Sequence, residues 1–454
     1  MKSQHTMDLT NGSVTRKLIV FVLPLVASNL LQHLYNAADK AVVGQFAGKI
    51  ALAAVGSTGS ATTMLLNLLF GLSVGANIIN ANLLGAKKHK ELRRSMHTSI
   101  LLSVVCGVFL CVVGLLAAHP LLQLMSCPSN VIDQASLYMR IYFCGVPASM
   151  LYNFGAGILR TYGDTRRPMI ILAVSGIVNV LLNLIFVIVF KMTVDGVALA
   201  TIISQYISAV WVLTILFDPK GEYHLSKSEL KLHKEEVIAI VKVGIPCGIN
   251  GLVFSVSNVT VQSTVNGFGD TVIAGNVAAD SVSGLIYQVL AAFYTACVSF
   301  AGQCYGAEKY DRIDRLLLRS GGICVALVAA ASTAATVFPG FLLGVFNSDA
   351  EVIAAGTPKL LIMCWSYVLY AVSESLLGCL RGMRKTAIPT TINIIGICAT
   401  RVLWIWFVLP ADSMNVFLLY ACYPVSYVIS VSAMGSYYIY CRRKLRMQKK
   451  VLPV

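Results

Sequence analysis

Two stretches decide the fold of this chain: FVLPLVASNL at residues 21–30 and VGIPCGINGL at residues 243–252. Each places a proline inside an apolar run, and Pro24 and Pro246 stand 222 residues apart. The same offset, or one of 221, relates further pairs: Asn36 and Asn258, Phe46 and Phe268, Gly85 and Gly306, Arg160 and Arg381, and Pro168 and Pro389. The chain therefore contains two copies of one unit.

The composition indicates an integral membrane protein. Of 454 residues, 57% are hydrophobic and 12% are charged, whereas a soluble domain is roughly 25% charged. The net charge of +15 does not indicate a nucleic-acid partner, because the basic residues cluster in short connections between apolar runs. There they act as topology signals.

Apolar runs of about 20 residues are long enough to cross the roughly 30 Å hydrocarbon layer as helices. The sequence predicts twelve such spans, near residues 18–41, 52–82, 96–118, 135–159, 168–190, 196–217, 237–264, 272–300, 321–346, 352–380, 389–410 and 414–440. The predicted fold class is an all-α integral membrane protein, with twelve transmembrane helices in two six-helix bundles.

The basic residues also predict the orientation. Most of the 35 lysines and arginines fall in the two tails and in alternate connections, as in GAKKHKELRR at 85–94 and CRRKLRMQKK at 441–450, so both termini are expected in the cytoplasm. Because each half has six spans, the two halves enter the membrane the same way and the repeat is parallel. The predicted parts are an N-terminal bundle at 1–217, a cytoplasmic linker at 218–236, a C-terminal bundle at 237–441 and a basic cytoplasmic tail at 442–454.

Asp39 is the most informative residue of the first half. It lies in LLQHLYNAADKAVVGQFAG, residues 30–48, and a charge near the bilayer centre costs about 2.5 kcal/mol or more. One helical face holds Ser28, Gln32, Tyr35, Asn36 and Asp39, and a second stripe holds Ser175, Asn179 and Asn183. The two faces are expected to line a polar chamber with Asp39 as its only carboxylate. The alternative is that Asp39 sits at the outer interface beside Lys40.

The second half has polar stripes of its own. They comprise Asn276, Asp280, Ser283, Tyr287 and Gln288 in one span and Asn250, Asn258 and Gln262 in another. Glu374 occupies the repeat position of Asn153, and Arg401 lies deep enough to suggest an ion pair with Glu374 or Asp280. Two simpler interpretations stay open: a structural pair of Glu374 with Arg401, and polar stripes that only join helices.

The sequence lacks the motifs of direct ATP drive and of catalysis. No GxxxxGK[ST] loop, histidine-rich metal cluster or nucleophile with a neighbouring base occurs in it. A secondary transporter, not an enzyme, fits these observations.

Four motifs carry a family resemblance along almost the whole chain. They are LYNAADKAVVGQFAGKIALAAVG at 34–56, GLSVGANIINANLLGAKK at 71–88, GILRTYGDTRRP at 157–168 and its repeat GCLRGMRKTAIP at 378–389. With them the chain resembles the multidrug and toxic compound extrusion (MATE) transporters. The resemblance implies two bundles around a cavity that opens alternately to each side, and export of small organic cations in exchange for protons or sodium ions. It also implies a monomer in the inner (plasma) membrane with no cofactor other than the coupling ion.

Carried over position by position, the resemblance assigns candidate roles. Asp39 corresponds to the coupling acid, with Tyr35, Asn179 and Thr201 beside it. Asn183 stands where many relatives carry a second acid, so one carboxylate remains, which favours protons over sodium at Asp39. The substrate cavity or second-half polar site is expected to use Asn36, Asn153, Asn258, Asp280, Gln288, Glu374 and Arg401.

Two alternative functions stay open at this stage. A flippase for lipid-linked precursors would share the parallel repeat but should carry a more strongly cationic cavity. The other alternative is a membrane-embedded enzyme or scaffold. An enzyme would need a cluster of catalytic residues, and a passive scaffold would lack the polar stripes.

Overall fold

The computed structural model describes residues 6–125, 127–219, 221, 223, 225–409 and 415–451. Every regular element of these residues is helical, which confirms the predicted all-α class. Parts of the predicted linker and tail, residues 220, 222, 224 and 452–454, lie outside the described residues, as do residues 410–414 beside the last predicted span.

The elements before the middle of the chain are α1 (Val14–Val42), η1 (Val43–Ala47), α2 (Lys49–Gly85), α3 (His89–Leu124), α4 (Ile132–Thr161), α5 (Arg166–Leu184), η2 (Ile185–Val189), α6 (Val194–Leu216) and η3 (Lys227–Glu229). The later elements are α7 (Lys234–Val265), η4 (Asn266–Phe268), α8 (Asp270–Gly306), α9 (Tyr310–Val337), α10 (Pro339–Gly344), α11 (Ala350–Gly382), α12 (Ala387–Asn393), η5 (Ile394–Ala399), α13 (Thr400–Phe407), α14 (Val416–Tyr420) and α15 (Cys422–Val451).

Eleven helices of the described part are long and apolar enough to cross a membrane. The one predicted span that is not among these eleven, 135–159, corresponds to α4, which has 30 residues and includes Asp133, Arg140 and Asn153. Helix α4 packs against α2, α3 and α6, and its Asn153 is half-buried. The chain is thus a multi-pass membrane protein.

Contacts divide the chain into two compact units. One comprises Met1–Leu252 with Gly302–Lys309, and the other comprises Val253–Ala301 with Tyr310–Val454. The first unit therefore includes the start of α7 and the end of α8. The division into bundles at 1–217 and 237–441 stays a prediction about the repeat.

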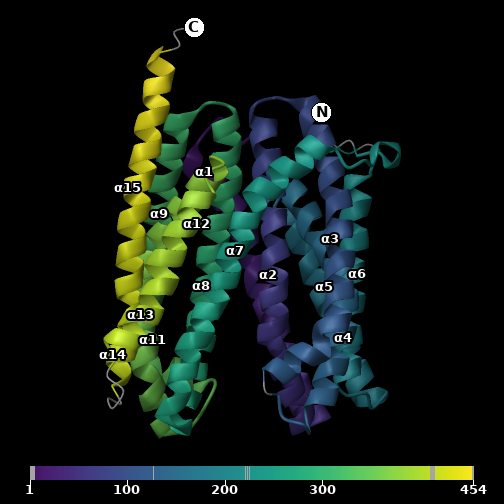
Figure 1. Ribbon diagram of the computed structural model, residues 1–454, viewed down its shortest axis with the longest axis vertical. Helices are drawn as coiled ribbons and strands as arrows, with labels where there is room; N and C mark the ends of the chain where they lie inside the picture. Colours follow the sequence, from purple (N-terminus) through teal and green to yellow (C-terminus); the bar gives the residue numbers. More distant parts are fainter. Residues whose placement is uncertain are drawn as a thin grey trace. The chain divides into compact units, whose positions relative to one another are not determined.

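Small residues let the helices of the first unit approach closely. Figure 1 shows the long helices of this unit running alongside one another, and α4 contacts both α3 and α6. A Cβ atom added to Gly107 would come within 2.6 Å of Cα of Pro147, and one on Gly114 within 2.1 Å of the Phe143 ring. Such close packing replaces hydrophobic collapse as the source of helix association in lipid.

The linker after α6 is fastened to α3. It forms the 3₁₀ turn η3, and Arg93 of α3 pairs with Glu229 at 2.7 Å. The Ser226 backbone N–H donates to Nε2 of His97 at 2.9 Å, and the Thr98 hydroxyl donates to the Lys231 carbonyl at 3.2 Å.

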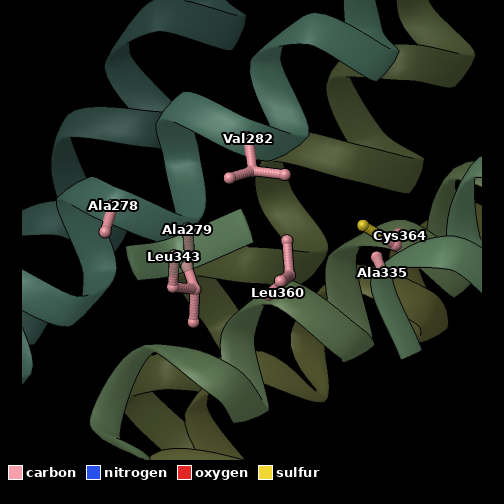
Figure 2. Close-up of a cluster of buried hydrophobic side chains, with 7 residues drawn as sticks. All are labelled: Ala278, Ala279, Val282, Ala335, Leu343, Leu360 and Cys364. Atoms are coloured by element: carbon pink, nitrogen blue, oxygen red, sulfur yellow. The ribbon is translucent and has the colours of Figure 1, made fainter. Parts of the chain in front are cut away.

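Within the second unit, α11 packs against α9 and α15. Figure 2 shows the apolar cluster that joins α8, α9, α10 and α11, formed by Ala278, Ala279, Val282, Ala335, Leu343, Leu360 and Cys364. The cluster fixes the register of α8 against α11, and this register determines which polar residues of the two helices meet.

A close crossing of α2 and α7 in the first unit predicts a strong effect of one added methyl group. Gly71 and Gly75 of α2 face Gly248 and Gly244 of α7, and a Cβ on Gly248 would lie 2.1 Å from the Leu68 carbonyl oxygen. We expect Gly248→Ala to lower the free energy of unfolding by about 1 to 3 kcal/mol, because backbone has to move. Thermal unfolding in detergent measures the change.

Gly59→Ala on α2 is the matched control, since a Cβ there meets nothing within 4 Å. The control should leave the midpoint unchanged or raise it, as alanine favours helix by up to about 1 kcal/mol. Equal midpoints for both variants would contradict the proposed crossing.

Candidate functional site

The first unit joins the two predicted polar stripes through hydrogen bonds. The Asn183 side-chain amide of α5 donates to Oδ1 of Asp39 of α1 at 2.5 Å. The same amide lies 3.4 Å from Oδ1 of Asn179, whose own amide donates to the Thr201 hydroxyl of α6 at 3.5 Å. The structure thus brings together Asp39, Asn179, Asn183 and Thr201, from three helices.

This group of four, the Asp39 cluster, is rich in oxygen atoms. Asn183 is 0% exposed and Asn179 is 5% exposed, whereas Asp39 is half-buried. Oδ1 of Asn183 has no hydrogen-bond partner among the described residues. Carboxylate, amide and hydroxyl oxygens are the ligands that hard cations prefer, so the side chains present fit a sodium ion as well as a proton on Asp39.

Tyr35 has a structural contact one turn before Asp39. Its hydroxyl donates to the Ala173 carbonyl of α5 at 3.0 Å, and Gly176 leaves the space for its ring, because a Cβ there would meet the ring at 1.8 Å. Tyr35 therefore holds α1 against α5. The earlier alternative placed Asp39 beside Lys40, whose side chain lies outside the described set.

Two further predicted residues of the first half, Asn36 and Asn153, have no hydrogen bond to the Asp39 cluster among those found in the described residues. Asn36 is exposed, and the Asn153 amide donates to the Ser149 carbonyl of its own helix at 2.8 Å. Residues that the sequence did not single out also lie near Asp39: Tyr138 and Tyr142 of α4 are within electrostatic reach of it, and Gln205 of α6 bonds to Tyr142. Tyr138 and Tyr142 are four residues apart and so share one face of α4, which is the sequence signal that could have identified them.

All three π-helical segments of the described chain border polar site residues. Segment η1 begins four residues after Asp39, η2 begins two residues after Asn183, and η5 ends two residues before Arg401. Segments of this kind are rare and occur frequently at functional sites, because they break the regular hydrogen-bond ladder. Helix α1, α5 and the α12–α13 helix are thus locally irregular where their polar side chains project.

In the second unit, Glu374 is surrounded by tyrosines. Its side chain is 8% exposed and hydrogen-bonds to Tyr370 of the same helix. The Tyr370 ring stacks on Tyr427 at 4.6 Å between centroids and on Tyr287 at 6.3 Å, and Tyr367 also contacts this group. A buried acid with aromatic walls suits an organic cation. Gln288 of α8 is half-buried in the same unit.

The predicted ion pair of Arg401 with Glu374 or Asp280 is wrong. Asp280 pairs instead with Lys359 of α11, with Nζ 2.5 Å from Oδ1, because the apolar cluster of Figure 2 sets α8 and α11 in this register. No carboxylate of the described residues forms an ion pair with Arg401. Its Nη1 donates to Oδ1 of Asn258 at 3.2 Å, and its Nε donates to the Ser426 hydroxyl at 3.3 Å.

Lys359 was missed by the sequence analysis, although it is a lysine within the apolar run GTPKLLIMCW at 356–365. It is 3% exposed and its ammonium lies 5.8 Å from the Tyr420 ring centroid. Asp280 also accepts from Asn276 at 3.3 Å, so the pair belongs to a local network.

Taken together, buried polar groups inside a multi-helix membrane body are typical of a transporter that binds its cargo between helices. The comparisons with known proteins agree with this class. The family model MatE matches residues 24–185 and 246–407, the two copies of the repeat, and the chain belongs to this family of transporters, not of enzymes.

Similar proteins span nearly the whole chain. The chain is 26% identical over 460 residues to the probable multidrug resistance protein YoeA of Bacillus subtilis, covering 98% of each chain. It is 27% identical over 401 residues to the probable multidrug resistance protein YpnP of Bacillus subtilis, covering 87% of this chain and 88% of that protein.

Solved structures share the fold. A MATE protein in the bent conformation matches with a TM-score of 0.87 at 21% identity, over 98% of both chains. A MOP superfamily transporter from Pyrococcus furiosus matches with a TM-score of 0.88 at 21% identity, over 99% of this chain and 100% of that one.

The ion pair in the second unit predicts unequal effects of removing its partners. Asp280 is 49% exposed whereas Lys359 is 3% exposed, so Asp280→Asn leaves a buried ammonium uncompensated. We expect this variant to lose about 3 kcal/mol of unfolding free energy. Lys359→Met leaves a carboxylate that is 49% exposed and should lose less than about 1 kcal/mol.

Thermal unfolding of both variants and the double variant in detergent measures this order. The double variant should resemble Lys359→Met, because its buried charge is gone. If Lys359→Met were the less stable of the two single variants, the pair would not be the one described.

Proposed function

We propose that the protein is a cation-coupled antiporter that exports cationic organic compounds by alternating access. The observation that carries this proposal is the bond between Asp39 and Asn183 within a membrane protein of the MatE family. The relatives named as multidrug resistance proteins support export of drug-like compounds. The protein works as a monomer in the inner membrane, with both termini in the cytoplasm.

The Asp39 cluster is the coupling site in this proposal. A proton or a sodium ion on Asp39 neutralises a charge that lipid and protein solvate poorly. The neutral carboxyl then bonds differently to Asn183, which changes how α1 packs on α5. We favour protons, because Asn183 supplies an amide where a second carboxylate would strengthen the hold on sodium.

The first helix has a place where such a change can bend it. Pro24 lies inside α1 and lacks a backbone N–H, so the helix misses one hydrogen bond there. One turn later, the Ser28 hydroxyl donates a hydrogen bond to the Pro24 carbonyl at 2.8 Å. A proline position is a common cause of a kink. Bending of α1 near Pro24 links the occupancy of Asp39 to the conformation.

Export then follows from linkage. The coupling ion drives the cycle only if it binds one conformation more tightly than the other, and the drug must prefer the opposite one. Glu374 among its tyrosines is the proposed contact for the cationic group of the drug. Because Glu374 belongs to the second half of the chain and Asp39 to the first, the drug and the coupling ion bind to different residues.

The proposal predicts the effect of Asp39→Asn on ion-driven transport. In proteoliposomes loaded with the cationic dye ethidium, a proton gradient should drive efflux through the unaltered protein. Asp39→Asn should slow this efflux at least about tenfold, because the coupling charge is absent. A sodium gradient imposed separately identifies the ion.

Asp133→Asn is the matched control, since Asp133 is an exposed carboxylate at the start of α4. It should transport at the unaltered rate. Efflux that survives in Asp39→Asn but is lost in Glu374→Gln would move coupling to the second half and reject the proposal for Asp39.

A further inference from the structure

Helices α9 and α15 are joined by a group of polar contacts, the α9–α15 clasp. Arg442 of α15 donates from Nε and Nη2 to the two carboxylate oxygens of Asp314 of α9 at 2.6 Å each. Its Nη2 also lies 3.2 Å from Oδ1 of Asp311, and the Tyr438 hydroxyl donates to Asp314 at 2.7 Å. Because Arg442 is 5% exposed, its charge is used up inside the clasp.

The exposed charges around the clasp are mostly basic. Asp314 is bonded to Arg442, so Asp311 is the one acid of α9 and α15 that keeps an exposed charge. Arg446 lies 3.6 Å from Asp314 and its side chain is still 68% exposed. The basic side chains exposed on the described parts of the two helices are Arg315, Arg319, Arg443, Lys444 and Arg446.

Apolar side chains continue from these basic residues along both helices. Leu318, beside Arg319 on α9, is 74% exposed, and Leu327 is 50% exposed about two turns further along. On α15, Tyr440 is 58% exposed and stands three residues before Arg443. Tyrosine is enriched where a membrane helix meets the headgroup layer. Each helix thus passes from an apolar, lipid-facing surface to a basic one.

This order of side chains matches an anionic phospholipid. Basic residues next to a membrane helix attract anionic lipids by about 1 kcal/mol each. Arginine binds phosphate oxygens through paired, charge-assisted hydrogen bonds. Free phosphate or an acidic protein segment would use the charges but leave the apolar surface below them uncovered, whereas acyl chains cover it.

We propose that the basic ends of α9 and α15 bind the phosphates of an anionic phospholipid such as cardiolipin, whose acyl chains lie along the apolar surfaces of the same helices. With both termini in the cytoplasm, as proposed above, this lipid belongs to the inner leaflet. Its phosphates offset the repulsion between the like charges on the two helices. The lipid therefore supports the clasp in holding α9 beside α15.

A titration of labelled lipid tests the proposal. Fluorescent cardiolipin and phosphatidylcholine with the same dye are each titrated with the full chain in dodecyl maltoside, and fluorescence polarisation measures both affinities. The protein should bind cardiolipin at least about tenfold more tightly, because phosphatidylcholine has no net charge for the basic residues to attract. Added salt should weaken cardiolipin binding alone, since exposed charges are screened.

Two double variants assign the preference to this surface. Arg315→Gln with Arg319→Gln removes two basic side chains of α9 and should raise the Kd for cardiolipin at least about tenfold. Arg443→Gln with Arg446→Gln should have the same effect from α15, and it leaves Arg442 on Asp314. Neither pair should change the affinity for phosphatidylcholine by more than about twofold.

Lys87→Gln with Lys90→Gln is the matched control, because it removes two exposed basic side chains beside the start of α3. It should change the Kd for cardiolipin less than about twofold. Equal weakening by the control and by the α9 pair would overturn the inference, since the attraction would then come from the total charge. Equal affinities of the unaltered protein for the two lipids would also overturn it.

Competition separates the lipid from other anionic partners. Inorganic phosphate that displaced cardiolipin at equal concentration would assign the surface to a free anion, and polyaspartate that did so would assign it to an acidic protein. Either result would overturn the inference, which expects neither competitor to displace the lipid. The assay involves no transport and no orientation in a membrane, so its outcome is separate from that of the Asp39 flux experiment.

Discussion

The hydrogen bond between Asn183 and Asp39 is the interaction on which the functional account depends. Lipid offers no donors, so a carboxylate in a membrane helix must find them in the protein. Here the side-chain amide of Asn183 on α5 supplies the donor, and the same amide also reaches Oδ1 of Asn179. Any change in the charge of Asp39 therefore reaches α5 and, through Thr201, α6. The Asp39 cluster therefore connects α1, α5 and α6 with one another.

The rest of the fold serves to hold such polar groups at defined positions. Glycines of α2 and α7 meet backbone to backbone, and Gly107 and Gly114 of α3 meet Pro147 and Phe143 of α4, so the helices are fixed by shape. The π-helical segments interrupt this regular packing next to Asp39, Asn183 and Arg401. The close glycine crossings keep the helices in place, while the π-helical segments change the local direction of the polar side chains beside them.

Much of this architecture was readable from the sequence. The offset between Pro24 and Pro246 predicted the repeat, which the family match at 24–185 and 246–407 supports. Helical spacing also predicted the polar face that ends at Asp39 and the stripe that ends at Asn183. Periodicity works in these cases because a polar face on a membrane helix has to avoid lipid.

The pairing of side chains between helices was not readable. Arg401 was expected beside an acid, but the register set by the apolar cluster brings Asp280 to Lys359 instead. Spacing along one helix carries no information about the rotation or height of its neighbour. For the same reason Tyr142 near Asp39 became apparent only in three dimensions.

The most direct test of the coupling site is the release of protons upon substrate binding. Weakly buffered protein in detergent, with a pH indicator dye in solution, should release roughly one proton for each ethidium bound, and Asp39→Asn should release none. That outcome would place ion and drug in competition through Asp39. Ethidium binding without proton release in the unaltered protein, or equal release in Asp39→Asn, would contradict the account.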